Sequence, residues 1–298
     1  MLNLLYALIP VFAWGTWLAP SQNVEYPNQQ VKTFYVTAAN LGLALLVLLI
    51  KGFGSLNVLT ANSFWLVFVG GVIWALSGLC GFTATAKIGL ARAFGIWAPL
   101  NIVVSMLWGA LLFDEFPDTS AAGRLILIAA LVIVIVGVLM IIFAKGGALP
   151  DGQALKDAWL GYAGAVGAGV LWGSYFIPIK VADISMWVGG FPLALGMLAG
   201  SALLVVAARQ MPRLARPSDA GRTLLTGVIW GVGNYGMLLL VAALGAGRGF
   251  TIAQLSVVVN ALVGIFWLKD PEPRSRAAWF TLAGCVLATV GGILLGNL

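Results

Sequence analysis

The chain has 298 residues, of which 61% are hydrophobic and 9% charged, and its formal net charge is +6. Soluble domains carry about 25% charged residues, so the composition excludes a water-soluble protein and predicts an all-α integral membrane protein. Lys and Arg stand singly at the ends of apolar runs, which argues against nucleic acid as a partner. Because the chain has no His, a His metal site is excluded, and we expect neither a metal nor a cofactor.

Ten apolar runs approach the roughly 20 residues that a transmembrane helix needs. They cover residues 3–20, 33–50, 64–86, 94–113, 123–143, 159–178, 187–207, 224–243, 250–268 and 278–296. No basic segment precedes the first run, so we expect a retained helix rather than a cleaved signal peptide. An even number of spans predicts that both termini lie on one side of the membrane.

The first run ends in Trp14-Gly15-Thr16-Trp17, followed by Pro20 and Glu25. A proline removes a helix hydrogen bond, and a break near the midplane frees backbone groups for a ligand. Trp14 is therefore a candidate wall of a substrate pocket, with core packing as the alternative. Glu25 is a candidate for proton coupling or gating, with a solvated helix end as the alternative.

The third and fourth runs carry the next candidates. Trp74 ends the sequence Gly-Val-Ile-Trp, and Arg92 lies in the tight turn between the two runs. Arg92 either ties helix ends together through their free carbonyls or forms a gate with a carboxylate. Asn101 and Ser105 lie four residues apart on one helix face, where they bond either to neighbouring helices or to a polar substrate.

The stretch 147–158 starts at the pair Gly146-Gly147 and contains Pro150-Asp151-Gly152, which predicts a flexible linker between two repeats, residues 1–146 and 159–298. The Trp-Gly element of the first run recurs 158 positions later, as Trp172-Gly173-Ser174-Tyr175 with Pro178 and Asp183. Trp230 and Arg248 follow Trp74 and Arg92 by 156 positions. Each repeat holds five spans, and because five is odd, the second enters the membrane from the opposite side. The sequence therefore predicts two inverted five-helix repeats, an arrangement of secondary transporters.

The second repeat supplies its own candidate residues. Candidates for substrate binding are Trp172, Trp230, Asn234, Tyr235, Gln254, Ser256 and Asn260. Candidates for coupling or gating are Asp183, Arg248 and Lys180, which stands where the first repeat has Gln22. For the polar residues inside spans, hydrogen bonding between helices is the alternative to substrate binding.

The basic residues of the loops predict the orientation, because cytoplasmic loops are enriched in Lys and Arg. One set of loops holds Lys32, Lys87, Arg92, Lys145, Lys156, Arg209, Arg213, Arg216, Arg222, Lys269, Arg274 and Arg276. The other set holds only Lys51, Arg124, Lys180 and Arg248. We expect the richer set to be cytoplasmic, which places both termini outside.

Two stretches resemble the glucose/ribose porter family. The first runs from Gly89-Leu90-Ala91-Arg92 through Pro99 to Glu115, and the second runs from Gln254-Leu255-Ser256 through Asn260 to Asp270. The Trp14-Gly15 pair is similar as well. The resemblance implies the ten-helix inverted architecture of the drug/metabolite transporter superfamily, and relatives of this kind carry glucose, rhamnose, ureides and other neutral metabolites.

These observations favour a secondary active transporter that moves a neutral small solute, foremost a sugar, across the inner membrane by alternating access. Its expected partners are the solute, the lipid bilayer and a proton, as a monomer or homodimer. The alternative is an uncoupled facilitator or an exporter of amino acids, ureides, drugs or other metabolites. An enzyme is not expected, because the sequence offers no catalytic cluster.

Overall fold

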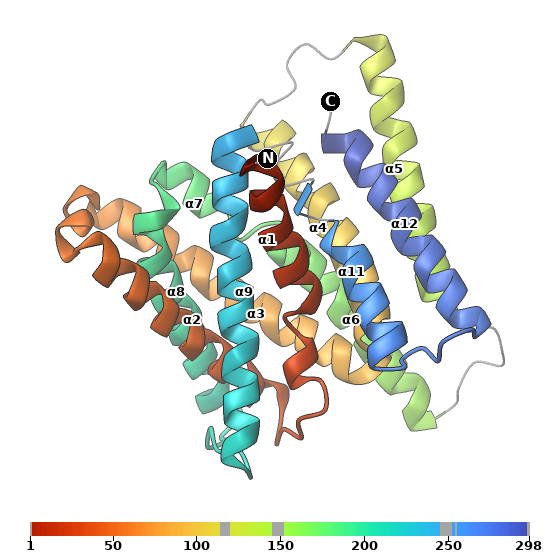
Figure 1. Cartoon of the computed structure of the whole chain (residues 1–298), viewed down its shortest axis with the longest axis horizontal. Coiled ribbons are helices and arrows are strands. Elements are labelled where there is room, and N and C mark those ends of the chain that lie inside the picture. Colours follow the sequence, from red (N-terminus) through yellow and green to blue (C-terminus); the bar gives the residue numbers. More distant parts are fainter. Residues whose placement is uncertain (1, 114–119, 145–151, 245–251, 254, 297–298) are drawn as a thin grey trace.

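The computed structural model describes residues 2–113, 120–144, 152–244, 252–253 and 255–296, and within them the regular secondary structure is helical, without strands (Figure 1). The first half contains α1 (Leu2–Thr16), η1 (Ala19–Ser21), α2 (Gln29–Lys51), η2 (Phe53–Val58), α3 (Ala61–Ile88), α4 (Leu90–Leu112) and α5 (Ala121–Ile142). The second half contains α6 (Gly152–Trp172), α7 (Ile177–Ala182), α8 (Met186–Ala207), α9 (Pro217–Leu244), α11 (Ser256–Leu262), η3 (Val263–Trp267) and α12 (Arg276–Gly296).

Among the described residues, seven helical segments are long and apolar enough to cross a membrane. They correspond to α2, α3, α4, α5, α6 continued into α7, α8 and α12. The other three expected spans overlap α1, α9, and α11 with η3. The chain is thus a helical integral membrane protein, while the count of ten spans remains a prediction. One boundary differs clearly, because α6 begins at Gly152, inside the expected linker.

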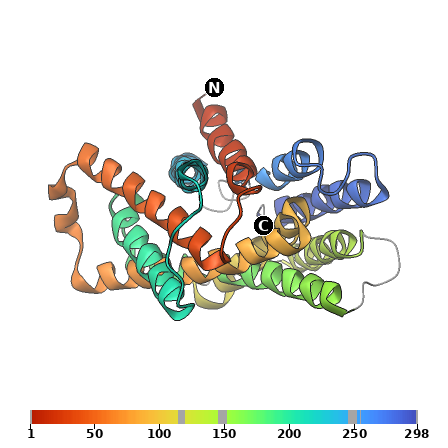
Figure 2. The ribbon, with the colours of Figure 1, turned by 90° about the horizontal axis from the view of Figure 1, so that it is seen from below.

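The helices run in alternating directions between two ends of the molecule (Figure 1). The start of α1 and the end of α12 lie at the same end, and the loop from α8 to α9 lies at the other. Both views place α5 beside α12 at one edge, and α2 with α8 toward the opposite edge (Figures 1 and 2).

The helices around the centre pack in corresponding pairs. α3 packs against α6 and α8, while α9 packs against α1 and α2. Likewise α4 contacts α6, and α11 contacts α1. Glycines allow the closest approaches: a Cβ on Gly71 would overlap the backbone of α8 at Leu193, and one on Gly227 would overlap the backbone of α2 at Val36. Small residues of this kind let helix backbones touch in lipid.

The two Trp-Gly elements interrupt their helices, as their prolines predict. α1 ends at Thr16 and the short helix η1 follows, while α6 ends at Trp172 and α7 follows. The breaks precede the prolines: Pro20 and Pro178 occupy the first turn of the new short helix. There the missing N–H of proline leaves no helix hydrogen bond unmade.

Two of the basic residues that we expected in loops are buried. Lys32 lies in the first turn of α2 and is only 3% exposed, and Arg92 lies in the first turn of α4 and is 5% exposed. Neither can be counted as a loop charge. Without them the expected cytoplasmic set still holds ten basic residues against four.

Candidate functional site

A cavity of ≈ 50 Å³ lies where the two halves of the chain meet. Its walls are mostly aromatic and come from both halves. The lining residues are Trp14, Trp17, Trp74, Phe94, Trp97, Ala98, Asn101, Trp172, Tyr175, Trp230 and Ser256. No charged side chain of the described residues lines it.

Trp172, the last residue of α6, is the centre of the aromatic wall. Its ring centroid lies 6.2 Å from Trp17, 6.0 Å from Trp74 and 5.1 Å from Trp97. Trp74 in turn meets Trp230 edge to face at 4.6 Å. Edge-to-face pairs at these distances stabilise one another by about 0.5–1.5 kcal/mol beyond their burial. The rings therefore form one connected wall between the halves.

Three polar atoms of the wall have no hydrogen-bond partner. These are Nε1 of Trp74, Nε1 of Trp172 and Oγ of Ser256, and all three are buried. Trp14 differs, because its Nε1 donates to the carbonyl of Trp230 at 3.3 Å. Buried polar groups are nearly always paired with protein, water or ligand. The residues that line the cavity thus carry two unpaired N–H donors and one unpaired hydroxyl.

Hydroxyl and amide side chains reach the backbone at both helix breaks. Asn260 Nδ2 donates to the carbonyl of Gly15 at 3.1 Å, and Ser105 Oγ lies 3.4 Å from the carbonyl of Gly173. Gly15 and Gly173 occupy the same place in the two Trp-Gly elements. Gly15 packs against the Ser256 carbonyl as Gly173 packs against the Asn101 carbonyl, so Ser256 corresponds to Asn101 and Asn260 to Ser105 in these contacts. The amide and the hydroxyl therefore exchange places between the halves. Both breaks are therefore held by a neighbouring polar helix face.

The expected substrate-binding residues divide into three groups. Trp14, Trp74, Trp172, Trp230, Asn101 and Ser256 line the cavity. Ser105 and Asn260 lie beside it, at the helix breaks. Asn234 and Tyr235 do not line it: Asn234 is buried, and Tyr235 stacks on Trp187 with ring centroids 5.3 Å apart. Gln254 falls outside the described residues.

The expected coupling residues lie away from the cavity. Glu25 and Asp183 are both exposed, in the segments that follow η1 and α7. Lys180 is also exposed, with Nζ 4.1 Å from the centre of the Phe113 ring. Arg248 falls outside the described residues.

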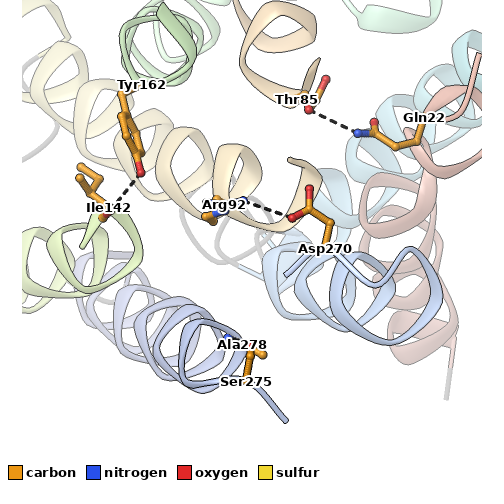
Figure 3. A network of polar contacts seen from close by, with 8 residues as sticks. All are labelled: Gln22, Thr85, Arg92, Ile142, Tyr162, Asp270, Ser275 and Ala278. Carbon is orange, nitrogen blue, oxygen red and sulfur yellow. Dashed lines mark hydrogen bonds and ion pairs between the residues drawn. The ribbon is translucent and has the colours of Figure 1, made fainter. Parts of the chain in front are cut away.

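Arg92 forms an ion pair with a carboxylate that follows the ninth expected span. Its guanidinium donates to Asp270 at 3.2 Å, with 6% of the Arg92 side chain and 46% of the Asp270 side chain exposed (Figure 3). Gly89 precedes α4 with φ +83°, and a Cβ there would overlap the Asp270 carboxylate. The pair ties the start of α4 to the segment that follows η3.

A second set of polar contacts closes the same end of the molecule. Gln22 Nε2 donates to the carbonyl of Thr85 at 3.3 Å (Figure 3). Arg222 Nε donates to the carbonyl of Pro20 at 2.8 Å, and the hydroxyls of Tyr26 and Thr223 are 2.7 Å apart. The loop between α1 and α2 is thus fastened to both α3 and α9.

Sequence reasoning missed four aromatic lining residues: Trp17, Phe94, Trp97 and Tyr175. Trp17 and Tyr175 belong to the repeated Trp-Gly elements, and Phe94 is repeated as Phe250, so repetition alone could have selected them. Trp97 has no such signal, because Ala253 stands 156 positions later.

An apolar helical bundle with an aromatic cavity where the two halves of the chain meet defines the class of protein: a multi-pass membrane protein. Residues 5–298 match the sugar transport protein family, and the chain belongs to that family. The chain is therefore a membrane transport protein and not an enzyme. The resemblance to sugar porters is confirmed at this level.

Relatives match the chain over nearly its full length. A "putative sugar uptake protein" of Enterococcus faecalis is 26% identical, with 99% of each chain covered. Proteins described in the same words occur in Listeria monocytogenes, at 26% identity and 99% coverage of each chain, and in Streptococcus agalactiae, at 28% identity and 99% and 98% coverage. One crystal structure aligns with 99% of this chain and 97% of its own, at a TM-score of 0.65 and 17% identity. That likeness concerns the fold alone.

Proposed function

We propose that the chain takes up a neutral sugar across the inner membrane by alternating access, with the sugar bound in the aromatic cavity between two inverted five-helix repeats. The family and the names of the relatives support sugar as the substrate class. The observation that carries the proposal is the set of three unpaired polar atoms, on Trp74, Trp172 and Ser256, in an aromatic wall.

The chemistry of that wall suits a sugar. A pyranose presents a flat face of C–H groups, which packs on indole rings, and hydroxyls around its edge, which bond to N–H and O–H groups. Unpaired donors in a buried site favour ligands with hydroxyls, because a ligand without them leaves the donors unsatisfied at about 1–3 kcal/mol each. An uncharged lining suits a neutral solute.

The packing of the helices supports two inverted repeats. Exchanging each helix for its counterpart turns the α3–α6 contact into α9–α1, α3–α8 into α9–α2, and α4–α6 into α11–α1. All of these pairs are in contact. The alternating helix directions and the common end for the start of α1 and the end of α12 agree with ten spans.

The size of the cavity supports alternating access. One buried water takes up about 10–15 Å³ of such space, so ≈ 50 Å³ holds a few waters rather than a sugar. A sugar can enter only if the rings of the two repeats move apart. The contacts of the α1–α2 loop with α3 and α9 would have to open for passage at that end.

A second candidate function is uncoupled facilitated diffusion. Glu25 and Asp183, the carboxylates expected to carry protons, are both exposed and away from the cavity. Exposed carboxylates need no partner in the protein. Their exposure therefore favours the alternative to proton coupling, in which both residues are solvated at the ends of helices. Movement down a gradient would need no titratable group at all.

The deciding experiment is uptake into proteoliposomes of a pool of sugars, polyols, ureides, nucleosides and amino acids, with and without an inward proton gradient. Accumulation of one sugar under the gradient is the expected result. Equilibration of a sugar regardless of the gradient would leave the facilitator, and transport of non-sugars only would refute the sugar proposal.

A further inference from the structure

The most unusual titratable group in the described chain is the buried amine of Lys32. Its side chain lies in the first turn of α2, at the end of the molecule that carries most of the basic residues, and the residue is 3% exposed. Among the described residues, no carboxylate lies within ion-pair distance of its Nζ atom. Removing an ammonium group from water without a counter-ion costs several kcal/mol. A lysine is seldom left in such a place without a function.

Two aromatic rings lie next to the amine of Lys32. Nζ lies 5.0 Å from the centre of the Phe82 ring and 5.3 Å from that of Tyr26, within the range of cation–π attraction. Phe82 packs against Trp17 with ring centroids 5.8 Å apart, and Trp17 lines the cavity. Lys32 is therefore one aromatic layer behind the wall of the proposed sugar site.

The neighbouring elements contribute few other titratable groups. The loop ahead of α2 contributes the exposed carboxylate of Glu25 and the phenol of Tyr26. Burial raises the pKa of Tyr26 to about 12, so this phenol stays neutral near pH 7. On α9, Arg222 and Asp219 act on the Tyr26 hydroxyl. On α3, the charged residue is Lys87, which pairs with Asp157 at 2.9 Å. α8 and η2, which also contact α2, contain no charged residue.

Lys32 also breaks the repeat. The backbone of Val36 in α2 contacts Gly227, and the backbone of Leu193 in α8 contacts Gly71 in the same way. Equivalent residues of α2 and α8 are therefore 157 positions apart. The counterpart of Lys32 is then Gly189. One half therefore has a buried amine where the other half has a glycine. This difference between the halves lies at the end of the molecule where α2 begins.

We propose that Lys32 is the proton-binding group that couples sugar transport to the proton gradient. The proposal rests on the proposed function. The loop of residues 17–28 places the Tyr26 ring near Lys32 and is held by the contacts of Gln22 with α3 and of Tyr26 with α9. When these contacts open, water reaches the amine and its affinity for a proton changes, because hydration favours the charged form. A proton affinity that differs between conformations is what coupling requires.

The test compares Lys32→Gln with Lys51→Gln in proteoliposomes, using radiolabelled D-glucose or the sugar that the uptake screen selects. Lys51 is the matched control, because it ends the same helix and lies 5.0 Å from the Trp187 ring, but is exposed. An inward gradient of one pH unit supports about tenfold accumulation at one proton per sugar. We expect this from the wild type and K51Q. K32Q should reach equal concentrations inside and outside, while still exchanging labelled for unlabelled sugar.

Each outcome separates the two proposals. A wild type that takes up no sugar refutes the proposed function, and the role of Lys32 falls with it. If the wild type equilibrates sugar regardless of the gradient, sugar transport stands but the role of Lys32 is overturned. Accumulation of sugar by K32Q would overturn the role of Lys32 as well.

A second variant and a second readout cover the case in which K32Q fails to fold. Lys32→Arg keeps a charge that cannot be lost, so it should also lose accumulation, and retained accumulation would overturn the proposal. In weakly buffered detergent solution, sugar binding should change the number of bound protons in the wild type and K51Q but not in K32R. Equal proton exchange in K32R would assign the proton to another group.

Discussion

At the scale of single residues, two unpaired indole nitrogens lie in the wall of the candidate site. Both Trp172 and Trp74 are buried with an unpaired Nε1, whereas the Nε1 of Trp108 donates to Ser174 at 2.8 Å. A core that serves only packing has no reason to leave two donors unsatisfied, since each costs about 1–3 kcal/mol. The cost is recovered if a substrate hydroxyl accepts from them.

Trp172→Phe tests this interpretation, because phenylalanine keeps a ring but removes the donor. Losing one hydrogen bond of about 1 kcal/mol to the sugar should raise KM for uptake roughly fivefold. Trp159→Phe is the control, because Trp159 is 65% exposed and lies away from the cavity. An unchanged KM for W172F would mean that its indole N–H does not contact the sugar.

The bonds at the two helix breaks differ in strength, and the difference is measurable. The carbonyl of Gly15 accepts from Asn260, whereas Ser105 donates mainly to the carbonyl of Asn101 on its own helix, at 2.7 Å against 3.4 Å to Gly173. Asn260→Ala should therefore destabilise the protein by about 1–3 kcal/mol, and Ser105→Ala by clearly less. Thermal unfolding in detergent measures both. A larger loss for S105A would contradict the comparison.

At the scale of helices, close contact between α3 and α8 depends on Gly71. Gly71→Ala would place a Cβ against the backbone of Leu193 and Met197, neither of which can move as a side chain can. Overpacking of this kind costs about 1–3 kcal/mol or more, so we expect a lower unfolding temperature and loss of transport.

Gly42→Ala is the matched control for the same substitution. Gly42 lies inside α2 and has no atom within 4 Å of the position of a new Cβ. Alanine favours a helix interior over glycine by about 0.5–1 kcal/mol, so G42A should leave the unfolding temperature unchanged or raise it. If G71A and G42A behave alike, the close contact of α3 with α8 does not matter to stability.

The helix pattern was largely accessible to sequence reasoning, and its failures have physical causes. Apolar runs and repeated prolines predicted where helices lie and that two of them break. The pattern could not predict that α6 begins at Gly152, because Lys156 and Asp157 in its second turn give this stretch the composition of a loop. An ion pair from Lys87 to Asp157 holds this turn, and such a contact between distant segments is invisible in hydropathy.

The candidate site was accessible only in part. Repetition in the sequence selected Trp14, Trp172, Trp74 and Trp230, and all four line the cavity. It could not select Lys32 or Trp97, which occur in one half only. Their significance depends on burial and on ring contacts, and both arise from packing between helices far apart in the chain.

At the scale of the whole molecule, the distribution of basic residues predicts how the protein lies in the membrane. The α8–α9 loop contains Arg209, Arg213 and Arg216, whereas the α2–α3 segment after Lys51 contains no charge through Asn62. Positive loops stay in the cytoplasm during insertion. The two loops also lie at opposite ends of the bundle, as Figure 1 shows.

A cysteine in each loop tests the orientation with a membrane-impermeant maleimide. Gly54 and Ala215 are both exposed, and neither substitution changes the charge. Intact cells should label Gly54→Cys but not Ala215→Cys, and permeabilised cells should label both. The unmodified protein gives the background, because Cys285 is buried and Cys80 half-buried. The reverse pattern would invert the orientation, and the water that reaches Lys32 would then come from outside, where the pH is lower under an inward proton gradient. Labelling of both sites in intact cells would contradict an odd number of spans between the loops.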